Sequence, residues 1–215
     1  MFAVFAVFAV STRTIGKSLK RQGLSVRHKR KFRRTADSKH KLPVEQNLLD
    51  RQFQVEYPNR VWVGGITYLR SSGGRLYLAV MIDLFARQVV GGQMSERIDQ
   101  ELVNVALEAA LINRGKPKSG LINTNRGSQY CAYSFVEMIS ENKLQQSMSR
   151  KRNCWESEHC SDAVAASFLA SLKKQAIYGR KLASRQGLRG RVFEYIDQYY
   201  NRVHRHSANG WITSL

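Results

Sequence analysis

The feature that most constrains the fold is a run of apolar residues at 75–84, RLYLAVMIDL. A strand of this composition is buried on both of its faces. RVWVGGITYLR at 60–70 precedes it across a turn at 71–74, and RQVVGGQMS at 87–95 follows it. These segments predict a meander whose middle strand is covered on both sides.

The segments after residue 95 alternate between helical and strand patterns. Apolar residues at helical spacing predict helices at 99–113, 133–142, 162–178 and 186–202. Short apolar runs at 120–125 and 144–148 predict two buried strands. The order β-β-β-α-β-α-β-α is typical of a mixed α/β sheet with helices on both faces.

The charge of the chain points to a polyanionic partner. Its 35 Lys and Arg against 16 Asp and Glu give a formal net charge of +19, and basic residues are concentrated between residues 11 and 42. Residues 14–26 predict a short helix with a turn at Gly23, half of a helix-turn-helix at best, and 27–54 a linker. The predicted DNA contacts in this basic arm are Arg27, Lys29, Arg30, Lys31, Arg33 and Arg34. The alternative is an arm that only interacts with solvent.

The cysteine spacing and residues 1–10 indicate in which cellular compartment the protein is expected. Cys131, Cys154 and Cys160 are odd in number and lack CxxC spacing, so they indicate neither a disulfide framework nor a zinc knuckle. A reducing cytoplasm is therefore expected. The irregular, apolar residues 1–10, MFAVFAVFAV, are too few to span a membrane and follow no basic residue, so we expect neither anchor nor signal peptide.

Four runs carry a family resemblance: VWVGGITYLR at 61–70, LYLAVMIDLFARQVVGGQMS at 76–95, NRGSQY at 125–130 and YNRVHRHSANGW at 200–211. In this order and spacing they closely resemble the second-frame transposases of bacterial insertion sequences. The resemblance covers about residues 27–215 and implies an RNase H-like (retroviral integrase core) α/β fold, a mixed five-stranded sheet flanked by helices. We expect an apolar start at 1–10, a basic arm with a truncated helix-turn-helix and linker at 11–55, and an integrase-type core at 56–215.

The same resemblance implies a chemistry that this chain lacks the residues to perform. The family cuts and joins DNA by phosphoryl transfer at two divalent ions, Mg or Mn, held by three acids. Matched residue by residue, those acids fall at Gly65, Asn125 and Ala166, all of them uncharged here. No metal cofactor is therefore expected, and no catalytic residue is intact.

Other acidic residues of the chain are weak candidates to replace the three metal ligands. Asp83 matches an Asp already present in the family pattern, and we expect it to make a structural hydrogen bond. Asp162 lies one helical turn from Ala166 and suits a helix N-cap. Residues 156–160, ESEHC, are extra relative to the family, and we favour a solvated loop over a new metal cluster.

The core offers further predicted DNA contacts. Lys173 lies seven residues beyond Ala166, where the family places a basic residue against the DNA end. With Lys174 and Arg126 it is predicted to contact DNA, and the alternative for the lysines is a solvated helix face.

We therefore expect a transposase-family protein that binds DNA and has lost strand transfer. One alternative is an active metal-dependent strand transferase with displaced ligands. Another is an inhibitory protein that joins the oligomer of an intact transposase. Homo-oligomers are also expected, in the bacterial cytoplasm and at the nucleoid.

Overall fold

A computed structural model describes residues 11–24, 40–50, 52, 54–149 and 163–206. The chain divides into two units, Met1–Arg33 and Arg34–Leu215. In the first, helix α1 (Thr12–Arg21) begins at Ser11, whose side chain accepts a hydrogen bond from the Thr14 backbone N–H. Gly23 follows the helix with φ at +68°, a conformation that favours glycine. The short helix and the turn predicted here are confirmed.

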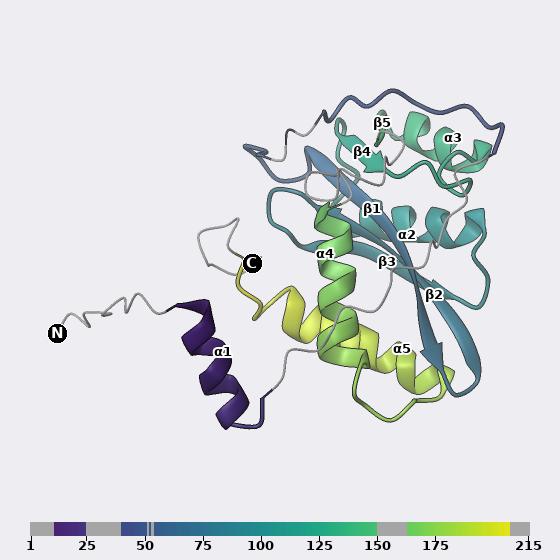
Figure 1. Cartoon of the computed structure of the whole chain (residues 1–215). Helices are drawn as coiled ribbons and strands as arrows, with labels where there is room; N and C mark the ends of the chain where they lie inside the picture. Colours follow the sequence, from purple (N-terminus) through teal and green to yellow (C-terminus); the bar gives the residue numbers. More distant parts are fainter. Residues whose placement is uncertain (1–10, 25–39, 51, 53, 150–162, 207–215) are drawn as a thin grey trace. The chain divides into compact units, whose positions relative to one another are not determined.

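The second unit is built on a five-stranded sheet in the order β3-β2-β1-β4-β5 (Figure 1). Strands β1 (Val61–Ser71), β2 (Gly74–Asp83) and β3 (Val89–Ser95) form the predicted antiparallel meander. Strands β4 (Leu121–Thr124) and β5 (Gln145–Met148) are parallel to β1. This mixed sheet confirms the predicted fold class.

Helices cover both faces of the sheet. On one face α2 (Gln100–Asn113) and α3 (Tyr133–Glu141) pack with Trp62, Ile66 and Met81. On the other, α4 (Ala163–Leu172) and α5 (Arg185–Glu194) pack with Val63 and Val80. The two apolar layers explain why β2 has buried side chains on both sides.

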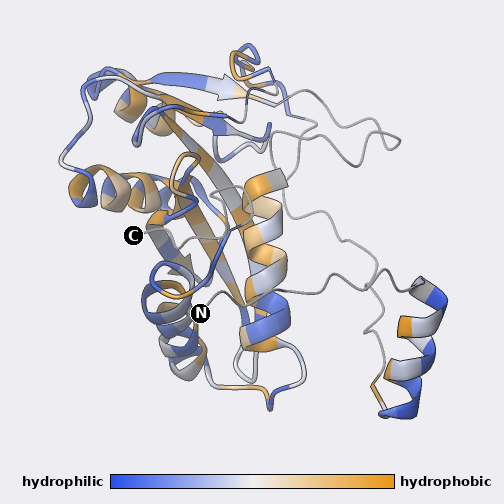
Figure 2. Cartoon of the chain, turned by 90° about the vertical axis from the view of Figure 1, so that its left-hand side faces the viewer, coloured by the Kyte–Doolittle hydropathy of each residue, from blue (hydrophilic) through white to orange (hydrophobic). Residues whose placement is uncertain are grey.

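Both C-terminal helices end differently from the prediction. Helix α4 continues as the π-helix η1 (Lys173–Ile177), and α5 continues as the π-helix η2 (Tyr195–Tyr200). In Figure 2 the mainly apolar helix α4 continues into a hydrophilic segment, which corresponds to the change from AVAASFLASL in α4 to Lys173 and Lys174 in η1. The sequence periodicity does not distinguish α-helical from π-helical turns.

Residues 40–50, part of the predicted linker, run along the core without regular secondary structure. The Met148 backbone N–H donates to the Gln46 carbonyl at 3.2 Å, and Leu49 is 4% exposed within the core. This segment is the dark blue trace near β4 and β5 in Figure 1. Among the described residues, no helix is long and apolar enough to cross a membrane.

Candidate functional site

The first family position, Gly65, lies in the middle of β1 and faces helix α4. A Cβ atom at Gly65 would lie 2.7 Å from the Cβ of Ala165 and 3.4 Å from Cδ1 of Leu169. Carbon atoms in contact are normally about 3.5–4.0 Å apart. The space that an acid would need at this point is therefore filled by α4.

The second position, Asn125, directly follows β4. Its Oδ1 accepts a hydrogen bond from the Gly127 backbone N–H at 2.9 Å, so the side chain stabilises the turn that leaves the strand. The register pairs Val63 with Asn123 on the parallel neighbour. Gly65 and Asn125 each follow this pair by two residues, so they lie at the same level of the sheet, Asn125 just past the end of β4.

The third position, Ala166, is exposed on α4, and the preceding Ala165 is the residue that meets Gly65. Strand β1, the end of β4 and the start of α4 therefore bring the three family positions into one neighbourhood. None of them carries a carboxylate.

The described residues do not fit a catalytic metal site. They contain no group of three or more His, Cys, Asp or Glu side chains placed to hold a metal ion. Two divalent ions close together need shared anionic ligands, which Gly, Asn and Ala do not provide. Asp162 and residues 156–160, the potential replacements, lie outside the described residues.

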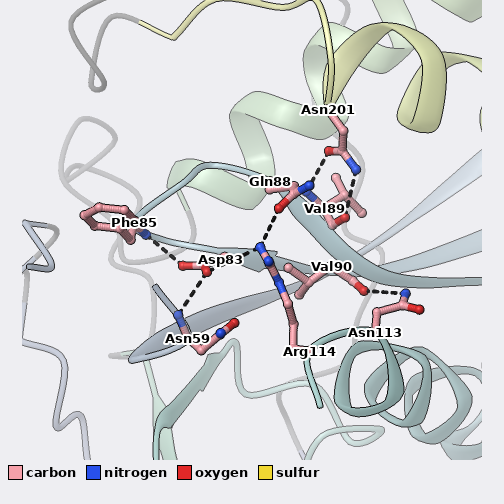
Figure 3. Close-up of polar contacts among 9 residues, drawn as sticks. All are labelled: Asn59, Asp83, Phe85, Gln88, Val89, Val90, Asn113, Arg114 and Asn201. Carbon is pink, nitrogen blue, oxygen red and sulfur yellow. Dashed lines mark hydrogen bonds and ion pairs between the residues drawn. The ribbon is translucent and has the colours of Figure 1, made fainter. Parts of the chain in front are cut away.

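Asp83 has the structural role that the sequence predicts. It is fully buried at the end of β2, where its carboxylate accepts hydrogen bonds from the backbone N–H groups of Asn59 (3.0 Å) and Phe85 (2.9 Å). The Arg114 guanidinium lies 3.7 Å from it and also donates to the Gln88 side chain (Figure 3). The Asp83 carboxylate thus joins the residues just before β1 to the turn that follows β2.

Arg126, a predicted DNA contact, follows Asn125 and is half-buried. Its Nε donates to the Ser149 carbonyl at 2.8 Å, and Ser149 N donates to the Thr124 carbonyl at 2.9 Å. The side chain therefore ties the loop after β4 to the end of β5. The backbone carbonyl of Arg126 lies 3.0 Å from His40 Nε2. The sequence did not predict this contact, because 86 residues separate the two partners.

Lys173 is placed by η1 over an aromatic ring. Its Nζ lies 5.0 Å from the centroid of the Tyr68 ring, within the range of a cation–π interaction. Burial lowers the pKa of the Lys173 ammonium. Lys174 beside it is exposed. The predicted arm contacts, residues 27–34, lie outside the described residues.

Comparisons with known proteins show which family the chain is similar to. The family model described as Integrase core domain matches residues 56–154. The transposase InsF for insertion sequence IS3A of Escherichia coli (strain K12) is 40% identical over 206 residues, 96% of this chain and 70% of that protein.

Solved structures match in fold. The simian T-cell lymphotropic virus intasome in complex with PP2A regulatory subunit B56 gamma gives a TM-score of 0.55 at 18% identity, covering 80% of this chain and 57% of that chain. The HTLV-2 integrase catalytic core domain in complex with magnesium, in its dimeric form, gives 0.51 at 17% identity, covering 75% and 95%. At these identities the likeness concerns the fold alone.

Proposed function

Because this chain belongs to the family of insertion-sequence transposases with an integrase-type core, we propose that it binds DNA but no longer cuts or joins it. The observation that carries the proposal is the contact between Gly65 and Ala165, which occupies the place of the first acid. Phosphoryl transfer in this family needs metal-bound charge to activate the attacking oxygen and to stabilise the leaving one. Gly65, Asn125 and Ala166 cannot supply it.

The test of lost chemistry is a plasmid assay. The full chain is incubated with supercoiled plasmid and Mg²⁺ or Mn²⁺, beside a boiled sample of the same protein. We expect equal nicking in both samples, and no heat of metal binding by calorimetry. Metal-dependent product above the boiled sample would overturn the proposal and support the alternative of an active enzyme with displaced ligands.

The proposed DNA contacts are the basic arm together with Arg126, Lys173 and Lys174. They are supported by the net charge of +19 and by the two lysines at the start of η1, about two helical turns beyond Ala166. Contacts to phosphate make binding insensitive to sequence and steeply dependent on salt. If about six phosphates are contacted, the affinity for duplex DNA falls roughly a thousandfold between 50 and 200 mM salt.

Deletion of residues 1–42 tests where these contacts lie. We expect the deletion to flatten the plot of log affinity against log salt, because it removes most of the predicted phosphate contacts. An unchanged slope would move the DNA contacts to the core.

A second candidate function is inhibition of an intact transposase by mixed assembly. A preserved fold without the acids favours it, and the dimeric form of the HTLV-2 integrase core supports self-association through this fold. Co-expression with an intact relative, followed by size-exclusion chromatography, should give mixed oligomers. Separate peaks for the two chains would eliminate this function.

We further propose that the protein acts in the bacterial cytoplasm, at the nucleoid. We also propose the division into an apolar start at 1–10, a basic arm with linker at 11–55 and a core at 56–215.

A further inference from the structure

Two histidines that the candidate site does not use lie beside the turn between β2 and β3. Asn201, at the end of η2, fixes this arrangement. Its Oδ1 accepts a hydrogen bond from the Val89 backbone N–H at 3.0 Å, and its Nδ2 donates to the Val89 carbonyl at 3.0 Å (Figure 3). Arg87 precedes Val89 by two residues, so the same contact brings it close to His204 and His206, which follow Asn201.

The two imidazole rings pack against the ring of Tyr200. The ring centroids of His204 and His206 are 4.7 Å apart, and they lie 5.2 and 5.0 Å from the Tyr200 centroid. Tyr199 contacts the His204 ring edge to face at 5.7 Å. These contacts hold both imidazoles at one place on the core unit.

Arg87, His204 and His206 share a second feature, a nitrogen without a partner. Arg87 Nε, His204 Nδ1 and His206 Nε2 are buried and have no hydrogen-bond partner among the described residues. Buried polar atoms are usually paired, so three unpaired nitrogens in neighbouring basic side chains indicate a missing acceptor. All three residues are only half-buried, which leaves an acceptor a route from solvent.

The charges of the cluster favour an anion as this acceptor. Burial, then the charges of His204 and Arg87, lower the pKa of His206 to about 4. The Arg87 charge also favours the ionised form of Tyr200, but burial outweighs it and raises the pKa of Tyr200 to about 12. The three basic side chains therefore act on one another without a negative charge between them.

The acids around this cluster already have cationic partners. Asp197 lies 3.6 Å from Arg202, and Asp83 lies 3.7 Å from Arg114. Arg205, between the two histidines, is exposed and adds a further positive charge.

We propose that Arg87, His204 and His206 bind an oxyanion of the phosphate type. A guanidinium group and a protonated imidazole donate charge-assisted hydrogen bonds to such an ion, and protonation makes both ring nitrogens donors. The bound anion also offsets the repulsion among the three basic side chains. The site lies at the end of the sheet where β1 begins, because the end of β2 pairs with the start of β1.

Two alternatives make different predictions. A transition metal held by His204 and His206 needs neutral rings, and the positive charge of Arg87 opposes it. A purely structural ring cluster, with its nitrogens bonded to water, has no preference for anions.

The test follows the imidazole C–H signals of the full chain by proton NMR while the pH is varied. Sulfate is the probe, because it stays a dianion over the range in which histidine titrates. His204→Gln and His206→Gln assign the two signals, and sodium chloride of equal ionic strength is the reference. We expect sulfate to raise the pKa of His206 from about 4 toward the ordinary value of about 6.5.

The same linkage fixes the sign of the pH dependence. Since the anion favours the protonated ring, the affinity for sulfate should rise as the pH falls below about 6.5. The rise should reach up to about tenfold per pH unit for each proton taken up. An affinity independent of pH would contradict the part of the proposal that assigns the histidines to the site.

A substitution in the turn tests the contribution of Arg87. Arg87→Gly removes the guanidinium, and glycine readily keeps the backbone φ of +60° found there. We expect sulfate to bind about tenfold more weakly or worse, because a charge-assisted hydrogen bond is lost. The matched control is Lys143→Gly, at an exposed residue with a φ of +58°, which should leave the affinity nearly unchanged. Equal losses in both variants would mean that sulfate responds only to net charge, against the proposal.

The phosphodiester backbone of DNA and a free phosphate ion share this chemistry, and a short duplex used in place of sulfate distinguishes them. A rise in the pKa of His206 with both probes would assign the site to DNA, and a rise with sulfate alone would assign it to a free oxyanion. The sulfate result decides the proposal even if the chain binds no DNA, so its failure and that of the proposed function are separate.

Two results would overturn the proposal. One is a pKa of His206 that neither sulfate nor the duplex moves relative to chloride. The other is a change of both histidine signals on addition of zinc chloride with none on addition of sulfate, which would favour the metal site. Both are measured on the parent protein, so the test stays decisive should Arg87→Gly fold poorly.

Discussion

The contact between β1 and α4 at Gly65 should make this position intolerant of any side chain. In Gly65→Ala the new methyl group would lie 2.7 Å from the Ala165 Cβ. Because that carbon is fixed to the helix backbone, α4 must move by about 1 Å to restore a normal contact. Overpacking of a well-packed core costs about 1–3 kcal/mol. At about 2–4 °C per kcal/mol for a chain of this size, the melting temperature should fall by roughly 2–12 °C.

A double-mutant cycle isolates this contact from other effects of the substitution. Ala165→Gly removes the opposing methyl group and costs about 0.5–1 kcal/mol of helix stability. When Gly65→Ala is combined with it, one methyl replaces the other, so the loss should be much smaller than the sum of the single losses. We expect an interaction energy of about 0.5–3 kcal/mol between the two sites, measured by urea unfolding.

The matched control is Gly190→Ala in α5, where a Cβ atom would have no neighbour within 4 Å outside the helix's own backbone. There the substitution should stabilise the helix by about 0.5–1 kcal/mol. If Gly65→Ala melted at or above the parent temperature while Gly190→Ala behaved as expected, α4 would not be closed onto β1. The argument that the acid's place is filled would then be wrong.

Three further predictions concern polar side chains that are buried or hydrogen-bonded in the core unit. Asp83→Ala leaves two backbone N–H groups without their acceptor and should lower the free energy of unfolding by about 2–4 kcal/mol. The control Asp197→Ala, at a partly exposed residue that forms an ion pair with Arg202, should change it by under about 1 kcal/mol. Equal losses would remove the structural role of Asp83. Asn201 bonds both backbone groups of Val89 (Figure 3), so Asn201→Ala should speed hydrogen exchange of the Val89 amide, and an unchanged rate would contradict this tie. Desolvation, then the charges of His204 and Arg87, lower the pKa of His206 to about 4. Because the neutral ring is favoured in the folded state, its contribution is complete above about pH 6.5 and is lost as the pH falls toward 4. His206→Phe should flatten that part of the stability profile, and a profile identical to the parent's would refute the assignment.

The fold was predictable because its signals are local and periodic. The apolar run at 75–84 required layers on both sides of the sheet, and the two apolar clusters supply them. The order of strands and helices after residue 60 follows from the same alternation of periods. Such patterns report burial along one segment, so they locate elements but not the contacts between them.

The contacts around the candidate site could not be predicted in this way. The pairs His40–Arg126 and Lys173–Tyr68 join residues far apart in the sequence, and neither has a spacing signal. The family resemblance located Gly65, Asn125 and Ala166, because it depends on matched motifs. It did not indicate that Ala165, one residue before the third position, would face Gly65. Side-chain direction on a packed helix depends on how the helix is rotated against the sheet.

Uncharged residues at the three family positions are compatible with a stable fold, because the fold does not depend on these residues. Carboxylates that converge on a metal repel one another when the metal is absent, so such a site lowers the stability of the unliganded protein. None of Gly65, Asn125 and Ala166 belongs to either apolar cluster. The buried acid that the fold does require, Asp83, is held by the backbone N–H groups of Asn59, before β1, and of Phe85, in the turn after β2. Uncharged residues at these positions therefore avoid such repulsion at no cost in core contacts, and α4 packs directly on β1 at Gly65. Ala165 is the residue of α4 that meets Gly65, whereas Ala166 stays exposed and Asn125 stays half-buried.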